Sequence, residues 1–386
     1  MITILRNNKL LLKRLKSILY SSLRFTNRLA SEKIRWRGVQ QIGYRNPRVY
    51  YGHDHLPSRD ERSGGAMIKF QDLQDEFPNT LRNANILYLV NSALPEFPEI
   101  MVREAKKKGV SFVLNQNGVA YPGWHGEGWE KKNRPMRYLL KNADYVIYQS
   151  EFCKVGADKF LAPCKTPWTV LYNPVNTQQF VPGSVVPSGS RILLAGSHQH
   201  FYRVRTALEA LKFITAHRPE ATLTIAGRYT WHESESECIA EAKSFAKELG
   251  IIDRVFFGGA YTQTEAPELF QNHHILLHTK YNDPCPRLVI EAMACGLPIV
   301  YSQSGGVHEL VGNQAGIGIP SILDWEQDHP PGPVELAEAT MQILASLKEY
   351  AASARKRAET CFDVKPWRES HAAIFKQIIK SKNHNN

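Results

Sequence analysis

The sequence lacks long apolar runs, clustered cysteines and an excess of one charge over most of its length. No stretch approaches the roughly 18 to 20 apolar residues of a membrane-spanning helix, and the start lacks the compact apolar core of a signal peptide. The six cysteines form no Cys-x-x-Cys pair, and none has zinc-finger spacing with histidines. We therefore expect a cytoplasmic protein of a reducing compartment, without a spanning helix.

The formal net charge of +11 is concentrated at one end of the chain. Residues 1–37 hold ten Lys or Arg and one acid, Glu32, so this segment carries +9. The remaining 349 residues carry only +2. Nucleic-acid binding by a basic surface spread over the folded body is therefore not expected.

The basic segment has helical periodicity. Between residues 10 and 29, leucines recur at steps of three or four from Leu12 to Leu23, with basic residues on the other faces. This pattern predicts a basic amphipathic helix lying on membrane headgroups, where each Lys or Arg contributes on the order of 1 kcal/mol. A solvated helix packed on the body is one alternative. An organelle transit peptide is another, since the first 31 residues contain no acid.

The sequence from residue 48 onward predicts two α/β domains. With 386 residues, 43% of them hydrophobic, the chain can fill two cores. From residue 48 to 171, and again from 192 to 350, short β-branched or aromatic runs alternate with helical stretches, which predicts parallel sheets covered on both faces. A Pro-, Gly- and Ser-rich run at 176–190 separates the two series. We expect two Rossmann-like, doubly wound domains facing each other across a cleft.

The most informative stretch, residues 282–312, reads NDPCPRLVIEAMACGLPIVYSQSGGVHELVG. It resembles the donor-binding segment of retaining GT-B glycosyltransferases of family 4, also called glycosyl transferases group 1. That segment has two acids separated by seven residues, then A-x-A-x-G-x-P-V and a Gly-Gly turn. Asp283 and Glu291 stand at the acid positions, and Gly305-Gly306 form the turn. Asp283 is a departure, because the family's first acid is usually Glu.

The two acids also have a physical interpretation. The DPCP run cannot be helical, so a helix begins near Arg287, with Asp283 in the loop before it and Glu291 about one turn in. Carboxylates placed there can accept hydrogen bonds from sugar hydroxyls. The resemblance implies that Asp283 contacts the transferred sugar and Glu291 the ribose. A helix N-cap at Asp283 and an Arg287–Glu291 helix pair are the structural alternatives.

Several groups are candidates for the donor diphosphate. Backbone N–H groups of a Gly-Gly turn before a short helix suit a phosphate. In the family, an Arg and a Lys after the first strand of the second domain face the diphosphate, but here Ser197 and Tyr202 hold those positions. Arg203 is then the first candidate for stabilising the leaving group. The predicted donor-binding residues are Ser197, Arg203, Arg205, Arg228, Arg287, Glu291, Gly305 and Gly306, with Gly64 and Gly65 from the first domain.

The first domain offers candidates for the acceptor side. Gly64-Gly65 resembles the glycine loop of the family, although an ordinary turn is the alternative. Asn115 and Asn117 follow the third predicted strand, and His125 lies among aromatic residues that suit stacking on a sugar face or packing in a core. We predict that Asn115, Asn117 and His125 contact the acceptor or the sugar.

No metal or cofactor is expected beyond the nucleotide-sugar donor. The Asp-x-Asp motif of metal-dependent GT-A transferases is absent, and His53 and His55 lack a third ligand. The resemblance implies a metal-independent, retaining transferase in which Asp283, Glu291 and Arg203 carry the chemistry.

The acceptor is expected to be a glycan or a lipid-linked molecule of cell-surface polysaccharide or lipopolysaccharide synthesis. Residues 1–37 would hold the protein peripherally at the inner face of the membrane. Because Ser197 and Tyr202 replace basic residues, a catalytically degenerate GT-B scaffold is the alternative, and a GT-B epimerase is a third possibility. The expected division is an extension at 1–40, an acceptor domain at 41–178, a donor domain at 179–363 and a helix at 364–386 that packs back on the first domain.

Overall fold

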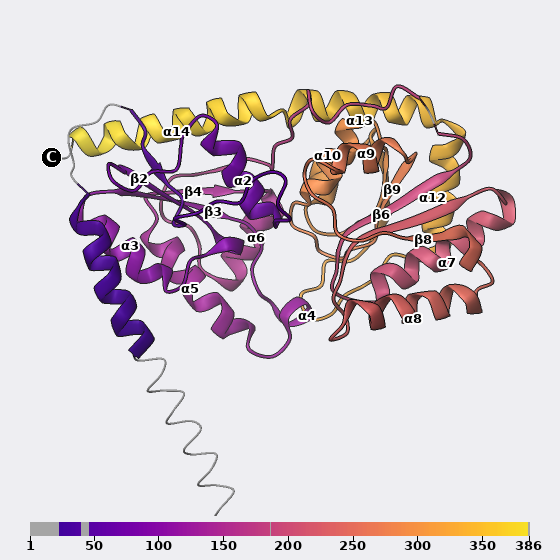
Figure 1. Cartoon of the computed structure of the whole chain (residues 1–386), viewed down its shortest axis with the longest axis horizontal. Coiled ribbons are helices and arrows are strands. Elements are labelled where there is room, and N and C mark those ends of the chain that lie inside the picture. Colours follow the sequence, from indigo (N-terminus) through magenta and orange to yellow (C-terminus); the bar gives the residue numbers. More distant parts are fainter. Residues whose placement is uncertain (1–22, 40–45, 186, 385–386) are drawn as a thin grey trace, which may run out of the picture.

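The computed structural model describes residues 23–39, 46–185 and 187–384. Two α/β units, each built on a parallel sheet, lie side by side along the long axis of the molecule (Figure 1). This arrangement confirms the predicted fold class. Most of the predicted amphipathic helix, residues 10–22, lies outside the described part of the chain. Within the described ranges, no helix combines the length and apolar character needed to cross a bilayer.

The first sheet has five parallel strands in chain order. They are β1 (Val49–Tyr50), β2 (Ile86–Val90), β3 (Ser111–Gln116), β4 (Tyr145–Tyr148) and β5 (Trp168–Val170). The connecting elements are α2 (Gly65–Gln74), η1 (Asn91–Ala93), α3 (Pro98–Lys107), α4 (Pro122–His125), α5 (Trp129–Asn142) and α6 (Glu151–Phe160). Alternate residues of β2 face opposite cores, because Leu87 and Leu89 pack with α3 and α5, whereas Tyr88 packs with α2.

The second sheet has six strands in the order β11-β10-β9-β6-β7-β8. The strands are β6 (Arg191–His198), β7 (Thr222–Tyr229), β8 (Val255–Phe257), β9 (Ile275–His278), β10 (Ile299–Gln303) and β11 (Gly316–Pro320). The helices are α7 (Tyr202–His217), α8 (Glu235–Glu248), η2 (Ile252–Arg254), α9 (Ala266–Gln271), α10 (Arg287–Ala294), α11 (Val307–Val311), α12 (Pro333–Ala345) and α13 (Leu347–Cys361). The strand order reverses between β6 and β9, where open α/β sheets bind ligands.

The segment after residue 312 differs most from the prediction. Strand β11 was not expected, because its sequence GIGIP contains two glycines and a proline. Gly316 is required by packing, since a Cβ there would lie 2.0 Å from the carbonyl oxygen of Ile299. The second series ends in two helices, α12 and α13, which meet at Ser346.

The chain crosses between the domains twice, at one place. Val175 pairs with the segment around Asp363, donating its N–H to Phe362 O at 2.8 Å. Phe180 already packs in the core of the second domain, so the crossing precedes most of the Pro-rich run 176–190. Helix α14 (Val364–His384) then returns over the first sheet (Figure 1).

Two contacts join the domains at the start of α6. The Glu309 carboxylate, from the second domain, accepts the backbone N–H groups of Glu151 at 2.8 Å and Phe152 at 2.9 Å. The Ser150 hydroxyl donates to Pro284 O at 2.7 Å. A carboxylate at a helix N-terminus is a favourable cap, so each domain completes the hydrogen bonding of the other.

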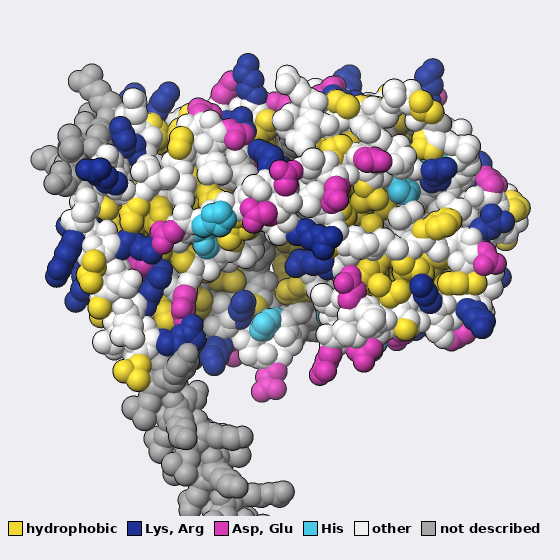
Figure 2. All heavy atoms as spheres, in the orientation of Figure 1, with side chains coloured by type: hydrophobic (Ala, Val, Ile, Leu, Met, Phe, Trp, Pro, Cys, Tyr) yellow, Lys and Arg dark blue, Asp and Glu magenta, His cyan; other side chains and the backbone are white. Residues whose placement is uncertain are grey.

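The N-terminal helix, residues 23–37, packs on the first domain. Trp36 is buried and donates its indole N–H to the Glu32 carboxylate at 2.9 Å. Arg28 and Arg35 form ion pairs with Glu32 and Asp54 at 2.8 and 2.6 Å. This part of the basic segment is therefore docked on the body. On the face shown in Figure 2, Lys and Arg side chains are interspersed with Asp and Glu.

Trp325 anchors the second domain in the core of the first. Its ring lies 4.8 Å from that of Tyr121 and stacks at 5.0 Å on that of Phe152, measured between centroids. We predict that Trp325→Ala lowers the free energy of unfolding by about 3 kcal/mol, because it leaves a large cavity. Ile322→Ala, in the same segment but 65% exposed, is the control and should cost about 0.5 kcal/mol or less. Equal losses in chemical denaturation would contradict this anchoring role.

Candidate active site

Asp283 lies in the loop between β9 and α10, at the carboxyl edge of the second sheet. One oxygen of its buried carboxylate is 3.2 Å from His278 Nε2 and 3.2 Å from Lys280 Nζ. Burial alone would raise the pKa of Asp283, but Lys280 and His278 outweigh it and hold the pKa well below its ordinary value. Asp283 is therefore ionised at neutral pH.

Glu291 lies in the second turn of α10 and is 2% exposed. Its Oε1 accepts hydrogen bonds from Arg287 Nε at 2.7 Å and Gln263 Nε2 at 3.1 Å. The Arg287–Glu291 pair weighed as a structural alternative is thus present. Arg287 also donates to Asp72 of α2 at 2.6 Å, across the domain interface. Burial disfavours its charge, but Asp72 and Glu291 raise the pKa of Arg287. The guanidinium of Arg287 is therefore already bonded to two carboxylates, those of Asp72 and Glu291.

The Gly305-Gly306 turn packs directly on the Asp283 loop. Gly305 has a φ of +68°, and a Cβ there would lie 2.5 Å from Asp283 O. A Cβ on Gly306 would lie 2.1 Å from Pro284 O, so only glycine fits at either position. The Gly306 N–H, which the sequence suggested for a phosphate, donates to Asp283 O at 2.9 Å. In the structure, this turn holds the loop that carries Asp283.

Arg203, at the start of α7, is 2% exposed. Its Nη1 donates to Ser197 O, whereas Nε and Nη2 are buried without a partner among the described residues. Burial lowers the pKa of Arg203, while the negative charge of Asp283 acts in the opposite direction. A buried guanidinium with two unsatisfied donors is costly unless a ligand or water meets it. Arg203 and Asp283 are near enough for each charge to shift the pKa of the other, at the switch point where β6 and β9 are neighbours.

The other predicted basic residues are arranged differently. Arg228, opposite Ser197 in the β6–β7 register, donates to the Ser197 hydroxyl at 2.9 Å and is exposed. Arg205 points away to solvent, where it pairs with Glu209 at 3.0 Å. The structure thus brings Ser197, Arg203 and Arg228 together and leaves Arg205 outside the group.

Asn115 lies inside the first domain rather than at a surface. Its Oδ1 accepts from Lys69 Nζ at 3.1 Å and from Gln149 Nε2 at 2.7 Å, and its Nδ2 donates to the Tyr88 hydroxyl at 2.9 Å. Burial lowers the pKa of Lys69 to about 7. Since the Asn115 amide is fully engaged by protein, the structure does not direct it toward an acceptor.

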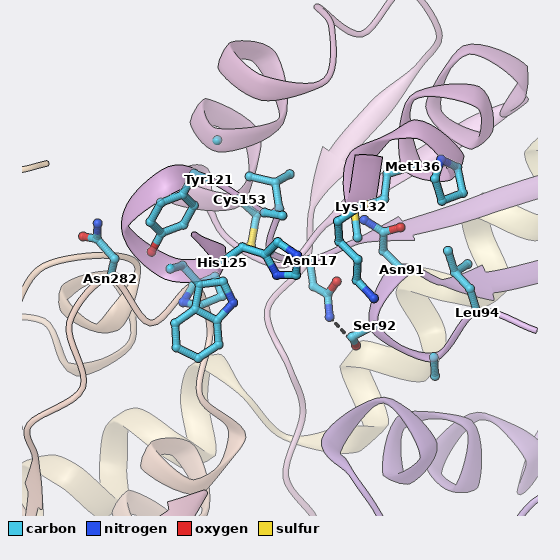
Figure 3. Close-up of a pocket in the computed structure, with 18 of the residues that line it drawn as sticks. Asn91, Ser92, Leu94, Asn117, Tyr121, His125, Lys132, Met136, Cys153 and Asn282 are labelled. Carbon is cyan, nitrogen blue, oxygen red and sulfur yellow. Dashed lines mark hydrogen bonds between the residues drawn. The ribbon is translucent and has the colours of Figure 1, made fainter. Parts of the chain in front are cut away.

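Asn117 and His125 line a cavity of about 580 Å³ between the domains. Most of its wall comes from the first domain, and the second domain contributes Lys280, Asn282, Pro284 and Trp325. Figure 3 shows Asn117, His125 and Lys132 close together in this space, and a dashed line marks the hydrogen bond from Asn117 to Ser92. The cavity adjoins the Asp283 loop, because Asn282 is part of its wall.

Gly64 and Gly65 begin α2 without a side-chain cap, and a Cβ on either would meet no atom within 4 Å. The preceding loop reaches the second domain, where Thr264 donates to Asp60 at 2.7 Å. His53, considered as a metal ligand, lies 2.9 Å from Ala93 O. Within the described ranges, no group of three or more His, Cys, Asp or Glu could hold a metal ion.

Sequence reasoning missed several residues of this site, namely Asn91, Lys132, His278, Lys280, Asn282 and Trp325. Asn91 could have been found, because it follows β2 directly, just as Asn117 follows β3. No pattern in the sequence pointed to Trp325, since it enters the first domain from a loop far along the chain.

Comparisons with known proteins find similarity to glycosyltransferases. A family model described as "Glycosyl transferases group 1" matches residues 186–327. The putative glycosyltransferase YtcC of Bacillus subtilis is 22% identical over 279 residues, 67% of each chain. The lipopolysaccharide core biosynthesis mannosyltransferase LpsB of Rhizobium meliloti is 22% identical over 263 residues, covering 66% of this chain and 69% of LpsB.

Solved structures share the fold. Anabaena HepE in complex with UDP-glucose matches with a TM-score of 0.68 at 16% identity, over 86% of this chain and 99% of HepE. Sucrose-phosphate synthase from Thermosynechococcus elongatus matches with a TM-score of 0.62 at 16% identity, over 82% and 78% of the two chains. The chain therefore has the GT-B fold of these structures, and its segment 186–327, which contains Asp283 and Glu291, is similar to the glycosyl transferases group 1 family.

Proposed function

We propose that this glycosyltransferase moves a sugar from a nucleotide diphosphate donor to an acceptor, with retention of configuration and without a metal ion. The observation that carries the proposal is that ionised Asp283 lies near Arg203 at the switch point of the second sheet. Arg203 is buried and has two hydrogen-bond donors without partners among the described residues. A carboxylate can accept hydrogen bonds from sugar hydroxyls, and a guanidinium can bind a diphosphate. The two groups suit opposite ends of a sugar diphosphate.

In this proposal Arg203 stabilises the departing diphosphate. The leaving group gains negative charge in the transition state, and pre-positioned donors in a site of low polarity stabilise that charge most strongly. The two free donors of Arg203, Nε and Nη2, are already buried. Arg228 and the uncapped start of α2 at Gly64-Gly65 are further candidates for the phosphates.

Asp283 orients the sugar and Glu291 the ribose of the donor. Gln263 and Arg287 hold one oxygen of Glu291, so the direction of its carboxylate is set before the donor arrives. The glycine turn packs on the backbone of the loop that carries Asp283 and holds that loop in place. Such pre-organisation lets binding energy act on the reacting sugar.

The acceptor is proposed to be a glycan or a lipid-linked molecule at the inner face of the membrane. One relative is named for lipopolysaccharide core biosynthesis and another for Vi polysaccharide biosynthesis, which supports a cell-surface product. The basic segment 1–37 would supply the membrane contact. Its described part exposes Leu23, Phe25 and Ile34 by 61%, 43% and 65%, which suits insertion among headgroups.

A catalytically degenerate scaffold is the second candidate, favoured by one observation. Ser197 and Tyr202 stand where the resemblance leads us to expect basic residues, and the Tyr202 hydroxyl accepts the backbone N–H of Tyr281 at 3.1 Å. Transfer from a panel of radiolabelled nucleotide sugars decides between the two. Nucleotide binding without any turnover would favour the scaffold.

We predict that Glu291→Gln lowers kcat/KM for transfer by roughly 100-fold or more, because the neutral amide weakens a charge-assisted contact that orients the donor. The variant should remain folded by circular dichroism, since Arg287 keeps its ion pair with Asp72. Glu268→Gln, an exposed change in α9 of the same domain, is the control and should behave like wild type. Wild-type turnover by Glu291→Gln would contradict the assignment.

Arg203 and Arg205 form a matched pair at the start of α7, one buried and one exposed. We predict that Arg203→Lys weakens UDP binding by about tenfold, since a single ammonium replaces a fork of donors. Transfer should fall further than binding, because the contact strengthens in the transition state. Arg205→Lys should change neither quantity. Calorimetric titration with UDP tests this, and equal effects of the two variants would argue against a diphosphate contact at Arg203.

A further inference from the structure

The cavity between the domains has a one-sided charge. Among the described residues that line it, Lys132 and Lys280 are basic, His125 contributes an imidazole, and none is Asp or Glu. Lys280 already has partners, because its ammonium forms an ion pair with Asp283 at 3.2 Å and lies 4.9 Å from the centre of the Trp124 ring. Lys132 is exposed and forms no ion pair with any residue in the described ranges. A cleft lined in this way attracts an anion.

Two buried amides that line the cavity, one from each domain, have unused hydrogen-bonding atoms. Asn91 is 3% exposed, and neither its Nδ2 nor its Oδ1 has a partner among the described residues. Asn282 is also 3% exposed and leaves its Oδ1 unpartnered. Buried amide atoms without partners are costly, and a hydroxyl can satisfy both a donor and an acceptor. The cavity is therefore suited to a ligand that also carries hydroxyl groups.

One side of the cavity is apolar. Leu94 and Pro95 line it just before α3, Pro98 lines it at the start of α3, and Pro135 and Met136 of α5 line it as well. The segment before α3 also touches the N-terminal helix, because the ring of Phe97 lies 5.7 Å from that of Phe25. The apolar wall is therefore next to the helix that we propose for membrane contact.

From these three features we infer that the acceptor is a phosphate ester with an apolar chain. Its phosphate would lie at Lys132 and His125, its hydroxyls at Asn91 and Asn282, and its chain along the apolar wall. Figure 3 shows Lys132 and His125 reaching into the same space as Asn117. Asn282 immediately precedes Asp283, so a hydroxyl held there is next to the donor sugar. The inference rests on the proposed function and names its acceptor class.

The test uses the full chain and three probes: octyl phosphate below its micelle-forming concentration, octyl glucoside, and glycerol 3-phosphate. Calorimetric titration should show octyl phosphate binding about tenfold more tightly than either of the others, since only it offers both the charge and the chain. Quenching of tryptophan fluorescence gives a second measurement, because Trp124 and Trp325 line the cavity.

Lys132→Glu should weaken octyl phosphate binding by about tenfold or more. Lys131→Glu is the matched control, because Lys131 is the preceding exposed residue of α5 but does not line the cavity. Both substitutions place an acid near the start of a helix, which does not disfavour folding. The control should change binding by less than about twofold.

Three results would overturn the inference: octyl glucoside or glycerol 3-phosphate binding as tightly as octyl phosphate, or equal losses in the two lysine variants. UDP binding is measured on the same samples and should not change in Lys132→Glu. Absence of UDP binding in the wild type would count against the proposed donor site instead. Failure of the acceptor assignment and failure of the proposed function are thus distinguishable.

Discussion

The guanidinium of Arg287 connects the two domains to the proposed donor site. It bonds Glu291 one turn along its own helix and Asp72 in the other domain, and all three side chains are buried. A buried ion pair is weak evidence for stability, because desolvation offsets much of the attraction. Its geometry is specific, however, so the orientation of Glu291 depends on the position of the first domain.

The loop that carries Asp283 is held in a related way. The Gly306 amide and the Ser150 hydroxyl, from different domains, bond the carbonyl groups of Asp283 and Pro284. Glu309, which follows the glycine turn, caps α6 in the first domain. Because the Ser150, Glu309 and Arg287 contacts cross the interface, movement of one domain relative to the other would disturb Asp283 and Glu291 together.

The proposed donor and acceptor sites differ in how they meet negative charge. On the donor side, a buried guanidinium has unsatisfied donors, which is costly without a ligand and strong with one. On the acceptor side, Lys132 is exposed, so its charge is screened by water and adds less to affinity. This difference fits a leaving group whose charge must be strongly stabilised in the transition state and an acceptor that must bind and then be released as product.

The order of strands and helices could be predicted from the sequence because hydrophobic periodicity and turn residues act over short distances. The two predicted α/β series are present, and the 282–312 motif placed Asp283 in a loop and Glu291 in a helix. Only the tertiary structure decided which partners the polar groups found. Gly306 bonds Asp283 O, Arg287 bonds Asp72, Asn115 is buried, and Trp325 enters the other domain. These choices join residues far apart in the chain, and their pairing depends on how the two domains pack.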